Sequence, residues 1–583
     1  MNGHTSKPEG MEGMPAIVAP AFPAGSGTHR GSRVIRRMRH LLDRTRSAGA
    51  QGACASSSGP STAELLQGCG EERTFSVAMT GQVDEALRKH LLRPDGQEDV
   101  IFALYQPSTG AARSTALLVD LVHPLDGERM VHGNASFSGD YFLRAVGLAA
   151  DRDLGVALLH SHPNGVGWQS MSADDRAAEA GHATGAHVIT GLPLVGLTLA
   201  GADLSYSARR WVRNQPTGTG APWRDQQAVT VRVVGERIRV NFNNRLLPVP
   251  PQTRRTVRTV QSWGRLAHQD LIRLRVGLIG AGSVAQLVAE SLVRTGFMHV
   301  DVFDFDVNEE HNLDRLLHAT SDDIGLFKVN TLVDQLRRRT VTPGAVVHGS
   351  TDSVVEQAGW LAALDCDVLF SCVDRPWPRY ALNVAAYAHL IPVIDGGVAV
   401  DVTTATARLV DADGDVPDVV DQTPDVVRLA GAEWRAHLVG PDRKCMECLG
   451  QYDPGDVGME RAGLLDDSTY LATLPADHRL RRGENVFAFS MACAAAEVLE
   501  LLRAVLGPSR IHDTGATLSH WTTATTDHDR SDCKPACPFS TSLLAAGDAA
   551  PVNVTGHHLA AEDRRRTARR KAADSAEVQA ERQ

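Results

Sequence analysis

A glycine-rich turn near the middle of the chain is the first stretch whose residue types could do chemistry. Arg275–Ile279 is largely apolar and branched, as is typical of a buried parallel strand, and it leads directly into the pattern G-x-G-x-x-A. In this pattern Gly280 and Gly282 would let the backbone approach a phosphate, and a helix beginning near Ser283 would attract the anion with its free amides. The turn predicts a nucleotide site, although a dehydrogenase or a plain glycine turn would show the same pattern.

Polar side chains follow at the ends of the next apolar stretches. His299–Phe305 is expected to form a second strand, and Asp304 lies near its end, where an acid would bind a ribose hydroxyl. Four more polar side chains come after it, namely Asn312, Arg315, Lys328 and Asp374. Fixed cations lower the barrier when the α-phosphate of ATP is attacked, and a carboxylate at a strand end is well placed to hold Mg²⁺. The set favours attack on ATP over hydride transfer, which has no need for Arg315 and Lys328.

A His-x-His pair lies further toward the N-terminus, at the end of another apolar stretch. Residues two apart on a strand project on the same face, so His160 and His162 could share one zinc ion. A carboxylate from the following helix would be the third ligand, which leaves the fourth position for a water molecule, as in catalytic zinc sites. That helix offers two candidate carboxylates, Asp174 and Asp175. A plain strand end, and a capping box begun by Ser172, would produce the same residues.

Four cysteines form two closely spaced pairs. Cys445 and Cys448 are separated by two residues, and Cys533 and Cys537 by three. This spacing predicts a closed structural zinc site with four thiolates, which would pin the C-terminal segment to the core. Unpaired surface cysteines in a reducing compartment are the alternative.

The whole chain bounds these expectations. Its 583 residues predict two or three domains, and a net charge of −10 gives no support to nucleic-acid binding. No apolar run reaches the roughly 18 residues needed for a membrane span, and no signal peptide is evident, so a cytoplasmic protein is expected. We expect a disordered arm over 1–72, a first α/β domain over 73–212, a linker with short strands over 213–255, the nucleotide domain over 256–545 and a charged tail over 546–583.

The motifs of the nucleotide domain resemble a known family. GAGSVA, DFDVNEEHNLDR, GLFK and CVDR are similar to the ThiF/MoeB/HesA group, the bacterial relatives of ubiquitin-activating enzymes. The resemblance implies a Rossmann-like domain with a mainly parallel sheet that uses ATP and Mg²⁺ to adenylate the C-terminal glycine of a ubiquitin-like or sulfur-carrier protein ending in Gly-Gly. It also implies that Asp304 binds ribose, that Asn312, Arg315 and Lys328 contact phosphates, and that Asp374 binds Mg²⁺. Arg258 would be supplied by the partner subunit of a homodimer.

The stretch where many relatives carry a reactive cysteine, Gly458–Gly463, has no thiol here. Cys372 and Cys493 are more simply interpreted as core residues. A covalent thiol step is therefore not expected.

The first α/β domain resembles the JAB/MPN zinc isopeptidases, whose signature is E…H-S-H-P…S-x-x-D. The resemblance implies that His160, His162 and Asp175 bind zinc, that Glu98 is the general acid/base and that Ser172 steadies the oxyanion. Asp99 is a rival to Glu98.

Together the two resemblances imply one pathway, in which the first domain trims or releases a carrier protein and the second activates its exposed carboxylate. The acceptor, sulfide or an amine, stays open. Three other hypotheses remain: adenylation of a peptide or small carboxylate, a Rossmann oxidoreductase, and an assembly scaffold with an inactive metal site.

Overall fold

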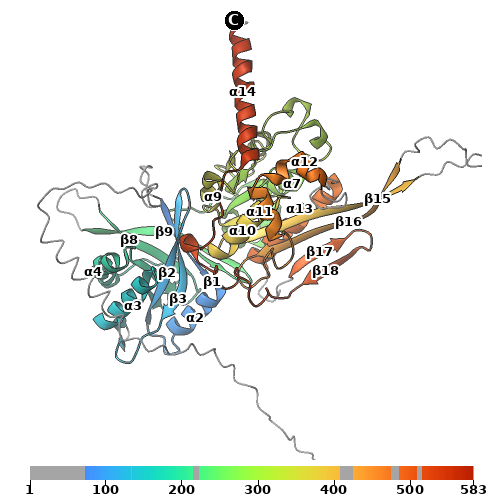
Figure 1. The fold of residues 1–583 in the computed structure, drawn as a ribbon. Helices are drawn as coiled ribbons and strands as arrows, with labels where there is room; N and C mark the ends of the chain where they lie inside the picture. The colour runs from blue at the N-terminus through green and yellow to red at the C-terminus, as the bar shows by residue number, and fades with distance from the viewer. Residues whose placement is uncertain are drawn as a thin grey trace, which may run out of the picture. The chain divides into compact units, whose positions relative to one another are not determined.

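The computed structural model describes residues 73–132, 134–214, 222–406, 425–473, 485–507 and 515–581 (Figure 1). The expected N-terminal arm, with Cys54 and Cys69, lies outside these residues. Within them, no helix is both long enough and apolar enough to cross a membrane.

The first sheet is built from strands that are buried over most of their length. Its order is β1 (Thr74–Thr80), β3 (Arg113–Val122), β2 (Val100–Thr109), β6 (Gly155–His162), β7 (Val195–Ala200), β8 (Tyr206–Arg213), β9 (Trp223–Val234) and β10 (Ile238–Phe242). β9 also pairs with β1, so the strands from β1 to β9 close into a ring. Helices α2 (Gly81–Leu91), α3 (Gly139–Asp151) and α4 (Ala173–Thr190) and a small hairpin, β4 (Arg129–His132) with β5 (Asn134–Phe137), complete this part.

Two strands of this sheet, β9 and β10, come from the stretch expected as a linker, 213–255. β9 is long enough to pair with β8 through its first half and with β1 and β10 through its second half. Ala228, Val231 and Val233 of β9 are buried in the core of the first sheet. This stretch is therefore part of the first sheet rather than a connection outside it.

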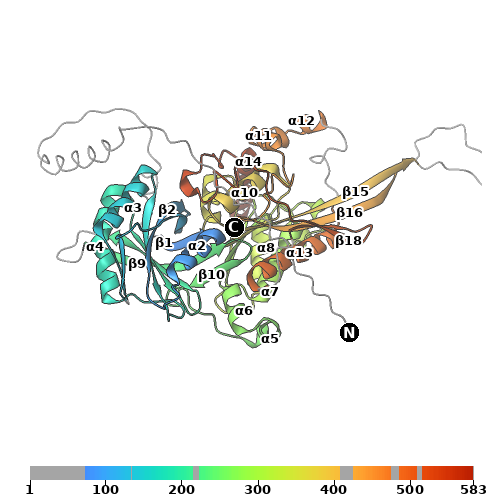
Figure 2. The same ribbon diagram turned by 90° about the horizontal axis from the view of Figure 1, so that it is seen from below.

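The second sheet is mixed. Its order is β13 (Val346–Ser350), β12 (His299–Phe303), β11 (Arg275–Ile279), β14 (Val368–Ser371), β15 (Val393–Thr406), β16 (Asp425–Val439), β17 (Ala516–His520) and β18 (Thr525–Asp529). The first five strands are parallel, as the resemblance to a Rossmann-like domain implies. The last three run antiparallel to their neighbours and extend the sheet (Figure 2).

Helices cover both faces of the second sheet. Successive residues of a strand point to opposite faces, so both sets of side chains are buried under helices. Leu278 packs in the core that contains α7 (Ser283–Thr295), α8 (Lys328–Arg337) and α13 (Phe487–Leu506), and its neighbour Ile279 packs with α9 (Gln357–Ala363) and α10 (Pro376–Ala388). This alternation is the physical reason that the strands are apolar throughout.

The chain reverses direction across the second sheet between β11 and β14. From β11 it proceeds to β12 and β13 on one side, and it then returns to β14 on the other side of β11. Loops leaving the carboxyl ends of two such strands diverge and leave a crevice, where α/β proteins bind ligands. Gly280 in this crevice has φ of +106°, and a Cβ there would lie 2.5 Å from the carbonyl oxygen of Cys372, so only glycine fits.

The C-terminal segment runs back over both sheets. After Cys537 the amide of Ala545 donates to the carbonyl of Tyr387 on α10 at 2.9 Å, and the hydroxyl of Thr109 on β2 donates to Asp548 at 2.6 Å. The segment then enters the long helix α14 (Leu559–Glu581). The residues expected as a charged tail thus include a helix whose first turns contact the second sheet.

Candidate nucleotide and metal sites

A cavity of about 670 Å³ opens at the carboxyl ends of β11, β12 and β14. Its lining includes all but one of the residues that the sequence assigned to the nucleotide, namely Gly280, Gly282, Ser283, Asp304, Asn312, Arg315, Lys328 and Asp374. These residues come from four separate loops or helix ends, so the fold and not the local sequence brings them together. The exception is Arg258, which lies exposed on α5 (Val257–Trp263) and does not line the cavity.

The glycine turn leaves an open path to the backbone. A Cβ built on Gly282 would meet no atom within 4 Å, so the space beside this residue is free for a ligand. Ser283 begins α7, and its Oγ accepts hydrogen bonds from Asn485 and from Ser490 on α13, each at 3.0 Å. The turn is therefore held against α13, and a free helix N-terminus is directed toward the cavity.

Asp304 directly follows β12 and is partly buried. Its Oδ2 accepts from the amide of Ala281 at 2.5 Å, and its Oδ1 accepts from the amide of Asp306 at 2.6 Å. Burial, together with the neighbouring charge of Asp306, raises the pKa of Asp304 to about 6. The carboxylate is therefore tied to the glycine turn, at the place where the sequence predicted a ribose contact.

The cations of the cavity are held by acidic partners. Lys328, the first residue of α8, lies 3.1 Å from Asp306 through its Nζ. Arg315 is about three-quarters buried and lies 3.0 Å from Asp314, which is itself exposed. Asn312 is buried and accepts from the amide of Glu309 at 3.2 Å. Arg315 and Lys328, two of the cations that line the cavity, are thus paired with carboxylates that are partly or largely exposed.

Asp374 is the carboxylate that the sequence assigned to Mg²⁺. It is exposed in the loop between β14 and α10 and lines the cavity. Carboxylates with open access to phosphate oxygens are the usual protein ligands of Mg²⁺ in nucleotide sites. The donor set therefore fits a Mg²⁺ ion brought in with a nucleotide.

Gly396, Gly397, Arg435 and Glu497 line the inner wall of the cavity, and the sequence singled out neither of these charged side chains nor Asp395 beside Arg435. Asp395 is fully buried, accepts from the hydroxyl of Ser371 at 2.7 Å and lies 3.3 Å from the guanidinium of Arg435. Glu497 is fully buried as well, and burial raises its pKa well above the ordinary value. A Cβ on Gly396 would collide with Glu497, and one on Gly397 would collide with Arg435. The glycine pair within β15 was the only sequence signal for this wall, because glycine in a strand often marks a close approach.

Two thiols lie near this wall and are poor nucleophiles. Cys372 lies 3.7 Å from Glu497, and Cys493 lies 3.9 Å from the same carboxyl group. Burial, reinforced by Glu497, raises the pKa of both thiols well above the ordinary value. Both cysteines are therefore protonated at neutral pH, which disfavours attack by either thiol.

The His-x-His pair of the first sheet lies at the end of β6, beside the start of α4. Nε2 of His160 lies 3.3 Å from Nε2 of His162, and an Oδ2 of Asp175 lies 3.7 Å and 3.8 Å from these two atoms. Two ligand nitrogens of a tetrahedral zinc ion are separated by about 3.3–3.4 Å, given bonds of about 2.0–2.1 Å. The three side chains form one of the two groups of metal-ligating residues found among the described residues.

Electrostatics favour the metal-binding forms of His160 and Asp175, whereas the contact with Asp175 raises the pKa of His162. Burial, and then the charge of Arg209, lowers the pKa of His160 to about 3, so its imidazole is neutral. The pKa of Asp175 is lowered, chiefly by His162. Nδ1 of His162 lies 3.3 Å from Oε1 of Gln169, which can accept its proton and orient the ring. A neutral imidazole and an ionised carboxylate are the states that bind zinc.

Asp99 and Asp174, the alternatives to Glu98 and Asp175, lie in other environments. Asp99 is buried and forms ion pairs with Arg129 at 2.7 Å and with Arg93 at 3.4 Å. Glu98 instead faces the charges of His162 and Asp175, and burial raises its pKa. Asp174 is exposed and does not belong to the group of ligands.

Ser172 caps the helix, since its Oγ accepts from the amide of Asp175 at 3.1 Å while its own amide donates to that carboxylate at 2.9 Å. Asp175 is therefore part of the capping box and also belongs to the group of metal-ligating residues.

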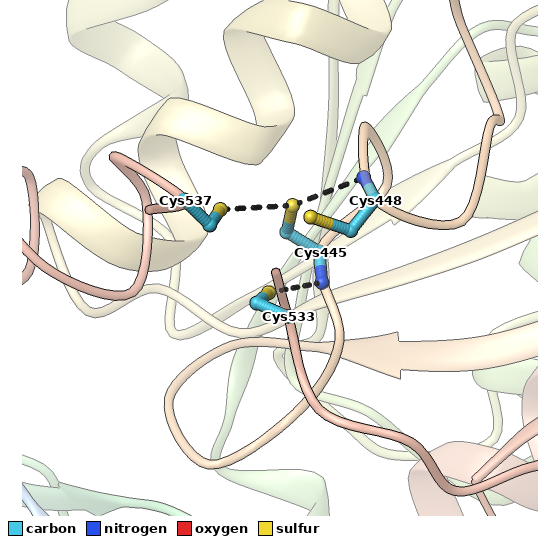
Figure 3. A group of neighbouring side chains, drawn as sticks. All are labelled: Cys445, Cys448, Cys533 and Cys537. Carbon is cyan, nitrogen blue, oxygen red and sulfur yellow. Dashed lines mark hydrogen bonds between the residues drawn. The ribbon is translucent and has the colours of Figure 1, made fainter. Parts of the chain in front are cut away.

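The second group of metal-ligating residues comprises the four cysteines (Figure 3). Sγ of Cys445 lies 3.6 Å from Sγ of Cys537, and the amide of Cys445 donates to Cys533 at 3.2 Å. Thiolates around a tetrahedral zinc ion are about 3.8 Å apart, given Zn–S bonds of about 2.3 Å. The donor set thus fits a structural zinc, and the cluster packs against α10 within the core of the second sheet.

Comparison with known families identifies part of the chain. Residues 253–539 match the ThiF family. The match begins after β10 and ends just beyond Cys537, so it contains the nucleotide cavity and the four cysteines.

Several curated proteins are similar over part of this chain. It is 25% identical over 142 residues to the tRNA threonylcarbamoyladenosine dehydratase of Escherichia coli, across 24% of this chain and 52% of that protein. It is 29% identical over 144 residues to ubiquitin-like modifier-activating enzyme 5 of Drosophila melanogaster, which covers 22% of this chain and 35% of that protein. It is 30% identical over 127 residues to the adenylyltransferase and sulfurtransferase uba4 of Aspergillus fumigatus, which covers 22% of this chain and 25% of that protein. The chain thus spans about half the length of the first of these relatives and less of the others.

Among solved structures, Escherichia coli MccB with MccA aligns with a TM-score of 0.36 and 16% identity, across 50% of this chain and 75% of that one.

Proposed function

Residues 253–539 form a ThiF-family domain, and from this premise we propose that the chain adenylates the terminal carboxylate of a polypeptide with ATP. The observation that carries the proposal is the cavity at the ends of β11, β12 and β14, where a glycine turn, two cations and an exposed carboxylate meet. None of these features alone is specific to adenylation. Their combination matches the needs of attack at an α-phosphate, in which negative charge grows on the phosphate oxygens and on the leaving pyrophosphate.

Each residue has a role in this proposal. Gly280, Gly282 and the start of α7 receive phosphate oxygens, and Asp304 accepts a hydrogen bond from ribose. Asn312, Arg315 and Lys328 hold the phosphate chain, and Asp374 binds Mg²⁺, which would neutralise charge on the phosphates. An oxygen of the substrate carboxylate bonds to the α-phosphorus while the bond from that phosphorus to the bridging oxygen breaks, and pyrophosphate leaves with the electron pair.

The substrate that we propose is a ubiquitin-like or sulfur-carrier protein ending in Gly-Gly. The names of two similar proteins, a ubiquitin-like modifier-activating enzyme and an adenylyltransferase and sulfurtransferase, support this class. Homodimerisation with Arg258 reaching a partner's cavity also stays a proposal, supported by the exposure of Arg258 outside its own cavity.

ATP–pyrophosphate exchange tests the adenylation. We expect exchange to depend on a carrier or peptide ending in a free Gly-Gly carboxylate, and to fall about 100-fold or more in Arg315→Ala, because a cation that acts mainly in the transition state is lost. Arg294→Ala is the matched control, since Arg294 is exposed on α7 and pairs with Glu290 outside the cavity. Exchange that survives in Arg315→Ala, or that proceeds equally with an amidated terminus, would contradict the proposal.

A second candidate function, zinc-dependent peptide hydrolysis by a JAB/MPN-like site, is favoured by the distances among His160, His162 and Asp175. When bound there, a zinc ion would supply an acidic water molecule. Glu98 is near enough to sense the charges of these ligands, and its raised pKa suits a group that takes a proton and later returns it. Ser172 keeps an O–H free to donate while its oxygen accepts from Asp175.

Metal analysis and a cleavage assay test this second function together. We expect two zinc ions per chain in the wild type and one in His162→Ala, the remaining ion being held by the cysteines. Glu98→Gln should retain both ions but lose cleavage of a carrier extended beyond its Gly-Gly, by about 100-fold or more. An unchanged zinc content in His162→Ala would contradict the zinc site. Cleavage that survives in Glu98→Gln would contradict the role of Glu98 as the general acid/base.

A further inference from the structure

The first turns of α14 form one wall of the nucleotide cavity. Ala560 and Arg564 are four residues apart, so they share one face of this helix, and both line the cavity, as does His558 just before it. The guanidinium of Arg564 lies 3.1 Å from Asp306 and 3.7 Å from Glu309. This arginine lies beyond residue 539, where the match to the ThiF family ends. It thus brings a cation to the cavity from a part of the chain that neither the motifs nor the family match covers.

Three consecutive arginines on α14 have three different environments. Arg564 faces the cavity. Arg565 forms a close ion pair with Glu356 and donates to the carbonyl of Thr351 at 2.9 Å, which anchors the helix to the second sheet. Arg566 is exposed and pairs only with Asp563 within the helix among the described residues. Arg566 can therefore serve as a control for the loss of a charge on α14, and Arg565 as a control for the position of the helix.

The segment before α14 fixes where this wall stands. The indole nitrogen of Trp377 donates to the carbonyl of Val554 at 2.9 Å, and the amide of Gly556 donates to the carbonyl of Val355 at 2.8 Å. His558 is buried, and its ring lies 4.8 Å from that of Phe305, which follows Asp304 in the loop after β12. The position of Arg564 is therefore set by packing on both sides of the cavity and not by its ion pair alone.

The charges around Arg564 leave room for an anion. Asp306 has Lys328 at 3.1 Å on one oxygen and Arg564 at 3.1 Å on the other. One carboxylate thus serves two cations, and Glu309 adds only a longer contact. Arginine presents several N–H donors in a planar fork, so it can keep one donor on Asp306 while others bind a phosphate oxygen. Lys328, on the other side of Asp306, is the residue assigned to the phosphates.

We propose that Arg564 binds the phosphate chain of ATP in the cavity of its own chain, which makes α14 part of the nucleotide site. The inference deepens the proposed function and rests on it. It differs from the expectation that the additional arginine comes from a partner subunit through Arg258. Arg564 then joins Arg315 and Lys328 as a cation that the chain itself supplies to the phosphates.

Direct binding of ATP with Mg²⁺ to the full chain, measured by titration calorimetry without any acceptor protein, tests the inference. We expect Arg564→Ala to weaken ATP binding about 10- to 100-fold, the range of a charge-assisted hydrogen bond, and Arg564→Lys to restore part of it. Arg566→Ala should bind ATP as the wild type does. Adenosine, which lacks phosphates, should bind Arg564→Ala and the wild type equally.

The outcomes separate the two proposals. A wild-type chain that does not bind ATP would overturn the proposed function itself. If the wild type binds ATP and Arg564→Ala matches Arg566→Ala, Arg564 has no part in binding. Equal losses for ATP and adenosine in Arg564→Ala would show that the residue only holds the wall in place.

Discussion

At the scale of single residues, we expect Asp304 to make nucleotide binding depend on pH. Burial and the charge of Asp306 raise the pKa of Asp304 to about 6, so the carboxyl group is largely protonated at pH 5 and ionised above pH 7. The amides of Ala281 and Asp306 each donate a hydrogen bond to one oxygen of Asp304. Only the ionised carboxylate leaves both of these oxygens able to accept hydrogen bonds. ATP affinity should therefore rise about tenfold between pH 5 and pH 7, as measured by titration calorimetry.

The raised pKa has the opposite effect on stability. A carboxyl group that holds its proton more tightly in the folded state contributes stability at low pH, and this contribution is lost as pH rises from about 4 to about 6. Asp304→Asn should bind ATP weakly and almost equally at pH 5 and pH 7, because the titrating group is gone. An unchanged pH dependence in this variant would assign the titration to another group.

At the scale of elements, the four cysteines connect the C-terminal segment to α10. Cys533 and Cys537 lie at the start of the segment that passes α10 and β2 and then becomes α14. Loss of one thiolate ligand opens a structural zinc site, and the folding free energy provided by the metal is lost with it. Because Arg564 lies downstream on the same segment, the cluster also supports the wall of the nucleotide cavity.

Cys537→Ser should therefore lose one zinc ion, lower the melting temperature by about 5 °C or more and speed proteolysis between Cys537 and α14. Metal analysis, calorimetry and limited proteolysis measure these effects. Cys493→Ala is a suitable control, because Cys493 is a buried thiol outside the cluster and its loss should leave the zinc content unchanged. Full zinc content in Cys537→Ser would remove the cluster from the list of metal sites.

At the scale of the whole molecule, buried charges join the two sheets. Asp367, just before β14, lies 2.5 Å from Arg113 on β3 and 3.0 Å from Arg232 on β9, and all three side chains are less than a tenth exposed. Removing one member of such a group leaves uncompensated buried charge, which typically costs about 3–5 kcal/mol. The same substitution in an exposed pair has almost no effect.

Asp367→Asn should lower the free energy of unfolding by about 3–5 kcal/mol in urea titrations, because two buried guanidinium groups lose their counter-ion. Asp120→Asn is the matched control, since Asp120 pairs with Arg152 and both are about half exposed. Equal stability of the two variants would mean that the two sheets are not held together by these charges.

The local sequence was enough to predict the features that depend on neighbouring residues. The glycine turn after β11, the shared face of His160 and His162 and the two cysteine pairs all follow from spacing along one element or one turn. Strand and helix positions in the first sheet were predictable for the same reason, because the apolar periodicity of β1, β2, β3 and β6 reflects a local conformation.

Tertiary packing alone decided between residues that are adjacent in the sequence. Asp175 lies within 4 Å of both imidazoles while Asp174 is exposed, and Glu98 experiences the charges of His162 and Asp175 while Asp99 is held by arginines. The closure of the first sheet by β9, the inner wall with Glu497 and the approach of Arg564 each depend on segments distant in the chain. No local pattern encodes such contacts, because their free energy comes from burial and charge pairing that exist only once the whole chain is folded.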